Sequence, residues 1–164
     1  MATAQLGSTV GGVVWAFVLD PVTGRPSALA APAGASGELV LDDAAMDRRG
    51  RFVYGPLARP FDHTPVSLQA AGAVAGFAIR STGALSPVPG SPFIAGIAPG
   101  AVAVDAESGF VLVGNGFARD PRSSASGASL SVYAADTGTG RLSDVGGSPF
   151  FVAAATVNAL AFAP

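Results

Sequence analysis

The residues best suited to chemistry lie in two segments of this 164-residue chain, 55–72 and 114–128. The first holds the single histidine, His63, whose imidazole titrates at a pKa of about 6.5 and could act as a general base. The guanidinium groups of the arginines in both segments could hold a phosphate or a carboxylate with two hydrogen bonds. We therefore assign His63, Arg59 and Arg119 as candidate catalytic residues, and Asp62, Asn115, Asp120 and Arg122 as candidate ligand contacts. The alternative is that these are solvated loop side chains, with Asp120 pairing locally with Arg119 or Arg122.

Other kinds of site are excluded or disfavoured by the composition. Zero cysteines exclude disulfides, thiolate metal sites and a cysteine nucleophile, and one histidine excludes a site that needs two imidazoles. The acidic group Asp42, Asp43 and Asp47 has no counterpart around Asp105, so we expect no metal site. The glycines of residues 136–140 precede no helix, so they do not form a phosphate loop. We expect no cofactor.

The charge and the hydropathy of the chain limit the classes of partner that it could bind. Charged residues make up 12% of the chain and the net charge is −2, so a broad basic surface for nucleic acid is absent. No apolar run reaches the ~20 residues that a membrane-spanning helix needs. Arg25 is the first basic residue, so we see no charged secretory leader, and we expect the protein to be either cytoplasmic or exported with its N-terminus missing from this sequence.

Internal repeats decide which elements must position these residues. The segment Ser81-Thr-Gly-Ala-Leu-Ser-Pro-Val-Pro-Gly-Ser-Pro-Phe93 returns as Gly138-Thr-Gly-Arg-Leu-Ser-Asp-Val-Gly-Gly-Ser-Pro-Phe150. A second piece, Met46-Asp-Arg-Arg-Gly-Arg-Phe-Val-Tyr54, returns as Val104-Asp-Ala-Glu-Ser-Gly-Phe-Val-Leu112. Self-similarity at such a period is typical of repeat architectures.

Each repeat predicts four short strands. The apolar runs are rich in valine and aromatic residues and lie between Gly, Pro, Asp and Ser clusters, which is the pattern of strands and tight turns. In the last full repeat we expect strands at 101–104, 110–113, 130–134 and 142–145. Four antiparallel strands per repeat of this length indicate the blade of an all-β propeller. A β-sandwich is the alternative, but sandwiches lack such internal identity.

The phase of the repeats predicts two complete blades and two partial ones. We expect the end of a blade in 1–37, blades in 38–97 and 98–150, and the first strand of a further blade in 151–164. Because propellers close with about four to eight blades, we expect a fragment of a longer propeller. The alternative is a ring assembled from copies of the chain.

The predicted topology also separates two ends of each blade. Tight turns should gather at one end, whereas the long segments 55–72 and 114–128 and the links 90–100 and 147–157 should gather at the other. Long irregular loops usually carry function, so the candidate residues belong to the second end. We expect Trp15, Phe17, Phe77 and Tyr133 to share one strand position and to pack between blades. We expect each Ser-Pro-Phe link to anchor its phenylalanine there as well.

The repeated residues resemble a known family. Residues 82–93, then Ala98-Pro-Gly-Ala-Val-Ala-Val-Asp105 and Gly109-Phe-Val-Leu-Val-Gly-Asn115, resemble the repeats of lactonase-family seven-bladed β-propellers, which are related to 6-phosphogluconolactonases and YVTN-type surface repeats. The first repeat departs from the pattern, with Gly55-Pro56 in place of an Ala-Asn end. The resemblance implies the fold, because the matched residues are turn and packing residues.

Three functional hypotheses follow. The first is a non-catalytic propeller module that binds a small sugar-type ligand or a protein partner on its long-loop end, or serves as a scaffold. The second is a sugar-lactone hydrolase of the 6-phosphogluconolactonase type, which the resemblance implies and which the loop arginines and His63 would have to serve. The third is a surface-layer or adhesion array.

Overall fold

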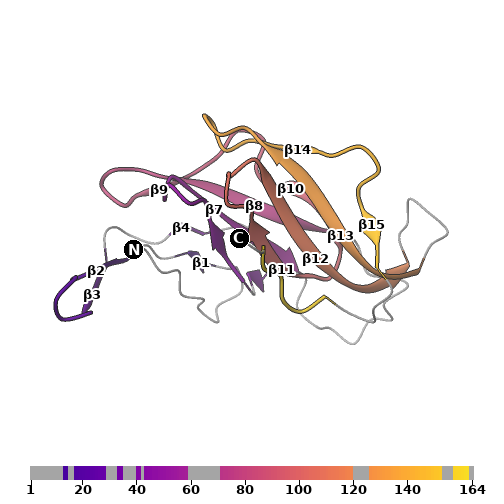
Figure 1. Cartoon of the computed structure of the whole chain (residues 1–164), viewed down its shortest axis with the longest axis horizontal. Coiled ribbons are helices and arrows are strands. Elements are labelled where there is room, and N and C mark those ends of the chain that lie inside the picture. Colours follow the sequence, from indigo (N-terminus) through magenta and orange to yellow (C-terminus); the bar gives the residue numbers. More distant parts are fainter. Residues whose placement is uncertain are drawn as a thin grey trace.

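The protein is all-β in the part of the chain that the structure describes. This computed structural model describes residues 13–14, 17–28, 33–34, 40–41, 43–58, 71–119, 126–152 and 157–162. Within them, every regular element is a strand, and the strands form two large and two small antiparallel sheets (Figure 1). The predicted all-β class is confirmed.

The first large sheet, which we call blade A, spans residues 40–97. Its centre is β7 (Phe52–Ala58) paired with β8 (Ala71–Ile79). Both outer positions are filled by two short strands instead of one long strand. Strands β5 (Val40–Leu41) and β6 (Ala45–Met46) pair with β7, while β9 (Leu85–Pro87) and β10 (Phe93–Ile97) pair with β8.

The second large sheet, blade B, repeats this plan over residues 99–151. Strand β11 (Pro99–Val104) pairs with β12 (Phe110–Arg119), which pairs with β13 (Ser126–Ala135). The far edge of β13 is again shared by two short strands, β14 (Leu142–Asp144) and β15 (Phe150–Phe151).

Two small sheets precede blade A. Strand β1 (Val13–Val14) pairs with β4 (Ala33–Gly34), and β2 (Phe17–Leu19) pairs with β3 (Pro26–Ala28). The β2–β3 hairpin lies where the repeats predict the last two strands of a blade, and it projects away from the large sheets (Figure 1). The division of the chain at 37, 97 and 150 stays a prediction.

The two Ser-Pro-Phe links lie toward the end of the blades that carries the long connections, as predicted, but they are not wholly irregular: β10 and β15 pair with the first halves of β8 and β13. The physical reason for this pairing is a side chain: the Ser91 hydroxyl accepts the Gly76 N–H at 2.9 Å, and the Ser148 hydroxyl accepts the Val132 N–H at 2.9 Å. Each serine therefore ties the turn before its phenylalanine to the edge of the central strand. Phe93 packs against the core between the blades as expected, whereas Phe150 is exposed, so the predicted anchoring is confirmed for the first link only.

The main core lies between the two blades. It is formed by blade A residues such as Phe52, Tyr54 and Val74 packed with blade B residues such as Val111 and Tyr133. A second cluster covers the other face of blade A and includes Val14, Leu41, Val53, Leu57 and Phe77. Burying a large apolar side chain contributes about 1.5–3 kcal/mol. Face-to-face packing of the blades is therefore a main source of stability.

The predicted aromatic position is confirmed in part. Phe77 and Tyr133 are buried in the two clusters, as expected for packing between layers. Phe17 is half-buried, and Trp15 lies outside the described residues.

Hydrogen bonds between the blades set their relative direction. Asp43 accepts the Val102 N–H at 3.0 Å, and the Ser108 hydroxyl accepts the Arg48 N–H at 3.3 Å. The β6–β7 turn therefore lies beside the β11–β12 turn. Because the blades point the same way, the β7–β8 and β12–β13 connections leave from the opposite end. The predicted separation of tight turns and long connections thus holds for both blades.

Candidate functional site

Most of the predicted site lies beyond what the structure describes. Arg59, Asp62 and His63 follow the end of β7, and Asp120 and Arg122 follow the end of β12; all five are outside the described residues. The backbone of Arg119 ends β12, paired with Ser126, and its side chain is not described. The ends of β7 and β12, from which both predicted segments continue, therefore lie at the same end of the molecule. The proposed roles of these residues stay predictions.

Asn115 is the one predicted site residue whose side chain is described, and it is fully buried. The two hydrogens of its amide nitrogen, Nδ2, are shared among three acceptors: the Ser131 hydroxyl at 3.0 Å, the Ser129 hydroxyl at 3.2 Å and the Ser129 carbonyl at 3.3 Å. Its Oδ1 atom is buried without a hydrogen-bond partner among the described residues. Burying a polar atom without a partner costs about 1–3 kcal/mol, so the bonds at Nδ2 must offset that cost.

The expectation that Asn115 lies in a loop was wrong. Strand β12 continues to Arg119, and β13 begins at Ser126, so most of segment 114–128 is a paired ribbon. A bulge between Asn115 and Ala118 interrupts the register without ending the strand. Gly114 and Gly116 are typical of a loop when the sequence is considered alone. Pairing with β13 overrides that local preference.

Asn115 also lies in the seam between the blades. A Cβ placed on Gly96 of β10 would come within 2.5 Å of the Asn115 Cγ atom, so only glycine fits there. The Gly96 N–H donates to the Ser131 hydroxyl at 3.2 Å, which links blade A to the same polar group. The neighbouring Gly116 N–H donates to the Ala98 carbonyl at 2.9 Å. This arrangement favours a structural role for Asn115 in joining the blades, while its predicted ligand contact remains untested.

The sequence reasoning missed the serines of this polar seam. Ser129 and Ser131 are buried and face the same side of β13 as Tyr133, because alternate residues of a strand share a face. Tyr133 extends the seam by donating its hydroxyl to the Ile94 carbonyl at 2.6 Å. The alternation Ser129-x-Ser131-x-Tyr133 was the signal that could have revealed the row.

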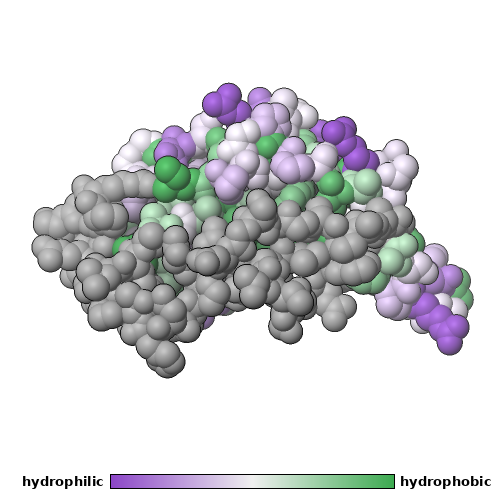
Figure 2. Space-filling view, turned by 180° about the vertical axis from the view of Figure 1, so that it is seen from behind, coloured by the Kyte–Doolittle hydropathy of each residue, from purple (hydrophilic) through white to green (hydrophobic). Residues whose placement is uncertain are grey.

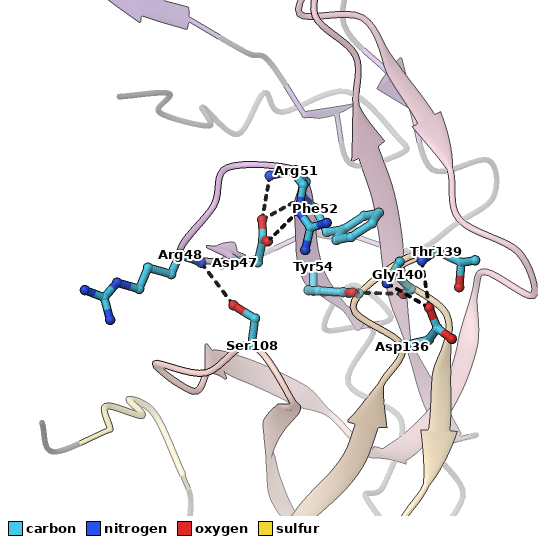
Figure 3. Close-up of polar contacts among 10 residues, drawn as sticks. Asp47, Arg48, Arg51, Phe52, Tyr54, Ser108, Asp136, Thr139 and Gly140 are labelled. Atoms are coloured by element: carbon cyan, nitrogen blue, oxygen red, sulfur yellow. Dashed lines mark hydrogen bonds and ion pairs between the residues drawn. The ribbon is translucent and has the colours of Figure 1, made fainter.

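The tight-turn end carries a second polar group, centred on Asp47 (Figure 3). The buried Asp47 carboxylate accepts the Arg51 N–H at 2.6 Å and the Phe52 N–H at 2.8 Å through Oδ1. Its Oδ2 lies 3.6 Å from Arg51 Nε, and the Arg51 guanidinium stands 5.2 Å from the centre of the Phe52 ring. These contacts close the β6–β7 turn, as the repeated aspartate predicted.

Tyr54 connects this turn region to blade B. Its hydroxyl donates to the Gly140 carbonyl at 2.8 Å, across the interface between the blades (Figure 3). Burial raises the pKa of Tyr54 to about 12, and the nearby Asp47 charge adds to the rise. The phenol therefore stays protonated at neutral pH and serves as a hydrogen-bond donor.

The described residues offer no metal centre. Among them, no group of three or more His, Asp or Glu side chains gathers closely enough to hold an ion. Likewise, no helix in the described part of the chain is long and apolar enough to cross a membrane.

Solved structures share this architecture. A candidate 6-phosphogluconolactonase from Bacteroides fragilis superposes with a TM-score of 0.68 and 20% identity, covering 94% of this chain and 37% of its own. The periplasmic gluconolactonase of Pseudomonas aeruginosa gives a TM-score of 0.55 and 14% identity, covering 87% of this chain and 36% of its own. The present chain thus spans little more than a third of either protein.

Sequence comparisons add no assignment. No family model matches the chain, and no curated protein matches its sequence.

The fold and the structural likeness together define the class: the chain folds as part of a β-propeller. More particularly, its fold is similar to part of a candidate 6-phosphogluconolactonase and part of a gluconolactonase. At these levels of identity the likeness concerns the fold alone.

Proposed function

We propose that this chain is a propeller module that binds a sugar-type ligand or a protein partner, or serves as a scaffold, through the end where its long connections leave. One observation carries the proposal. In the described part, the buried side chains of Asp47, Tyr54, Asn115 and Ser131 each make hydrogen bonds within or between the blades, although Asp47 Oδ2 and Asn115 Oδ1 accept none. They therefore build a rigid support, and any recognition falls to the connections after β7 and β12.

The second candidate function is lactone hydrolysis. It is favoured by the structural likeness to a candidate 6-phosphogluconolactonase and to a gluconolactonase. In this scheme His63 would accept a proton from water as the oxygen attacks the lactone carbonyl carbon. Arg59 or Arg119 would stabilise the oxyanion or hold a substrate phosphate. The ring C–O bond then breaks, leaving a carboxylate and a hydroxyl group.

The test compares binding with turnover on the same protein. Calorimetry with gluconate and 6-phosphogluconate measures binding, and proton release from the corresponding lactones measures turnover above the spontaneous rate. We expect binding of a sugar acid, or no binding if the module is a scaffold, without turnover. Turnover that falls at least tenfold in His63→Ala, Arg59→Ala or Arg119→Ala would instead establish the hydrolase.

A matched control separates these arginines from charge in general. Arg141 is exposed and lies at the tight-turn end, so Arg141→Ala removes one positive charge far from the long connections. We expect it to leave binding and turnover unchanged. Turnover that falls less than tenfold in all three site variants would show that the reaction uses other residues.

A further inference from the structure

Two hairpin turns in this protein have the same construction, although they are more than a hundred residues apart. In the β2–β3 turn, Asp20 Oδ1 accepts the N–H groups of Val22 and Thr23 at 2.9 and 2.6 Å. In the β13–β14 turn, Asp136 Oδ1 accepts the N–H groups of Gly138 and Thr139 at 2.9 and 2.7 Å.

The match extends through both turns. Glycine follows each threonine with a left-handed backbone, at φ 69° for Gly24 and 75° for Gly140, and its N–H returns to the aspartate carbonyl. In both turns the threonine hydrogen bonds lower the pKa of the aspartate. The turns over 20–25 and 136–141 are thus two copies of one rigid structure.

The turn over 136–141 has a docking partner inside the molecule. Gly140 lies against the Phe52 ring of blade A so closely that a Cβ on this glycine would collide with the ring. Its carbonyl accepts the Tyr54 hydroxyl, and Figure 3 shows both aromatic side chains facing this turn. Gly140 is consequently buried, and Phe52 is 7% exposed.

The turn over 20–25 has no such partner among the residues that the structure describes. All its residues are exposed, and a Cβ on Gly24 would meet nothing within 4 Å. The hairpin that carries it projects from the body of the molecule in both overall views (Figures 1 and 2). The structure of the turn that docks at 136–141 is therefore repeated at 20–25 with its surface exposed.

The surface that receives such a turn is also present in a free copy. Phe110 of blade B stands at the repeat position of Phe52 but is 47% exposed. Phe150 stands at the position of the half-buried Phe93 and is 43% exposed. Blade B therefore presents, on the face away from blade A, the same kind of aromatic surface that receives the turn over 136–141. We call this surface, formed by the exposed Phe110 and Phe150 and the half-buried Leu112, the open face; further along the same face of β12, Val157 of the same chain lies against Gly114.

We propose that the turn over 20–25 of one copy of this chain docks on the open face of blade B of a second copy. The contact would reproduce between chains the internal contact of Gly140 with Phe52, with Gly24 against the ring of Phe110. It joins two different surfaces, so it is heterologous, and it leads either to a closed ring or to an open chain of copies.

One residue difference between the blades determines how strong we expect the association between copies to be. Leu112 stands where blade A has Tyr54, so the contact between copies lacks the hydroxyl that bonds the glycine carbonyl. We expect the association to be weaker than the internal contact and to depend on protein concentration. Leu112→Tyr restores the hydroxyl and should strengthen the association about tenfold.

The first test follows the mass of the whole chain in solution over a range of concentrations. We expect reversible association that Phe110→Asp and Gly24→Asn each weaken at least tenfold. Asparagine tolerates a left-handed backbone, so Gly24→Asn keeps the turn while placing a side chain between the docking surfaces. Ile94→Asp is the control, because Ile94 is an exposed apolar residue of blade A outside the open face. It should leave the association unchanged.

A second test locates the contact directly, and it is simple because the chain has no cysteine. Val22→Cys marks the turn, and Ala134→Cys marks the open face, since Ala134 is exposed and pairs with Phe110. A mixture of these two variants should form a cross-linked dimer. A mixture of Val22→Cys with Ser81→Cys, which marks an exposed turn of blade A, should not.

Either of two results would overturn the proposal. One is a monomer at every concentration, which would leave the open face to a further blade or to another protein. The other is association or cross-linking that the Phe110, Gly24 and Ser81 variants do not distinguish.

Discussion

Blades A and B share one sequence pattern and one strand order, yet the same positions have different surroundings. Phe52 and Phe93 of blade A are covered by blade B, whereas Phe110 and Phe150 of blade B are exposed on its outer face. The difference comes from the neighbour and not from the blade. In a repeat protein the stability of each unit depends on the interface with the next, so equivalent residues need not contribute equally.

The repeated turn aspartates show the same lesson on a smaller scale. Asp47 is buried, accepts two backbone N–H groups and pairs with Arg51, whereas Asp105 is half-buried and its Oδ1 accepts the Phe110 N–H at 2.8 Å. Gly109 occupies the position of Arg51 in blade B and supplies no cation. The motif predicts the turn in both blades, while the fourth residue after the aspartate decides whether an ion pair forms.

Truncating the equivalent phenylalanines should give the largest difference between the blades. Phe52→Ala removes a buried ring and leaves a cavity, so we expect it to lower the free energy of unfolding by about 3–5 kcal/mol. Phe110→Ala acts on an exposed ring and should cost less than about 1 kcal/mol in the dissociated protein. Urea unfolding at low protein concentration measures both. Equal losses would show that blade B does not cover Phe52 as described.

The two matched turns provide the next comparison. Gly140→Val adds backbone strain and a collision with Phe52, so we expect a loss of about 2–4 kcal/mol in stability. Gly24→Val adds the strain alone and should cost about 1–2 kcal/mol, if the hairpin unfolds together with the rest. Thermal unfolding of both variants beside the wild type separates the strain from the collision. A larger loss for Gly24→Val would contradict the assignment of the docked turn.

Removing the hydroxyl between the blades should have a smaller effect. Tyr54→Phe keeps the packing but leaves the Gly140 carbonyl without its donor, at an expected cost of about 1 kcal/mol. Leucine has no hydrogen-bonding side-chain atom, so Leu112→Phe at the equivalent position of blade B breaks no side-chain hydrogen bond and serves as the control. Denaturant titration at pH 7 checks both. No loss in Tyr54→Phe would mean that water replaces the hydroxyl without penalty.

The same tyrosine should make stability depend on alkaline pH. The folded-state pKa of about 12 lies above the ordinary value of 10.0, so the unfolded chain releases this proton first as the pH rises. The contribution of Tyr54 to stability is therefore complete below about pH 10 and declines between pH 10 and 12. Comparing wild type with Tyr54→Phe across this range isolates it, because the second tyrosine, Tyr133, is common to both. Parallel curves would contradict the raised pKa.

Much of the fold follows from the sequence because its signals are local. The Thr-Gly turns at 23–24, 82–83 and 139–140 and the turn aspartates Asp47 and Asp105 close hairpins with residues a few positions away. Two features of the fold could not be predicted from the sequence because they depend on contacts with distant residues. The return of β10 to the sheet needs Ser91 to meet Gly76, and the extension of β12 past Asn115 needs β13.

The candidate site was less accessible to the same reasoning. Asn115 was chosen for its polar side chain between glycines, and its burial follows from Gly96 and Ser131, which belong to other strands. His63, Arg59, Asp62, Asp120 and Arg122 lie outside the described residues, so their selection still rests on residue type alone. Chemistry in a long connection is set by contacts that no local pattern encodes.

The division of the outer edge of each blade into two short strands has a consequence for solubility. A long straight edge strand offers a row of free N–H and C=O groups to which any extended chain can add, which is a route to amyloid-like aggregation. Here the outer edge breaks after three residues, where Gly90 or Gly147 turns the chain with a left-handed backbone. Pro92 and Pro149 follow and lack the N–H that a neighbouring strand would need. The broken outer edge of each blade thus disfavours uncontrolled strand addition, while the faces of the sheet remain available for specific packing.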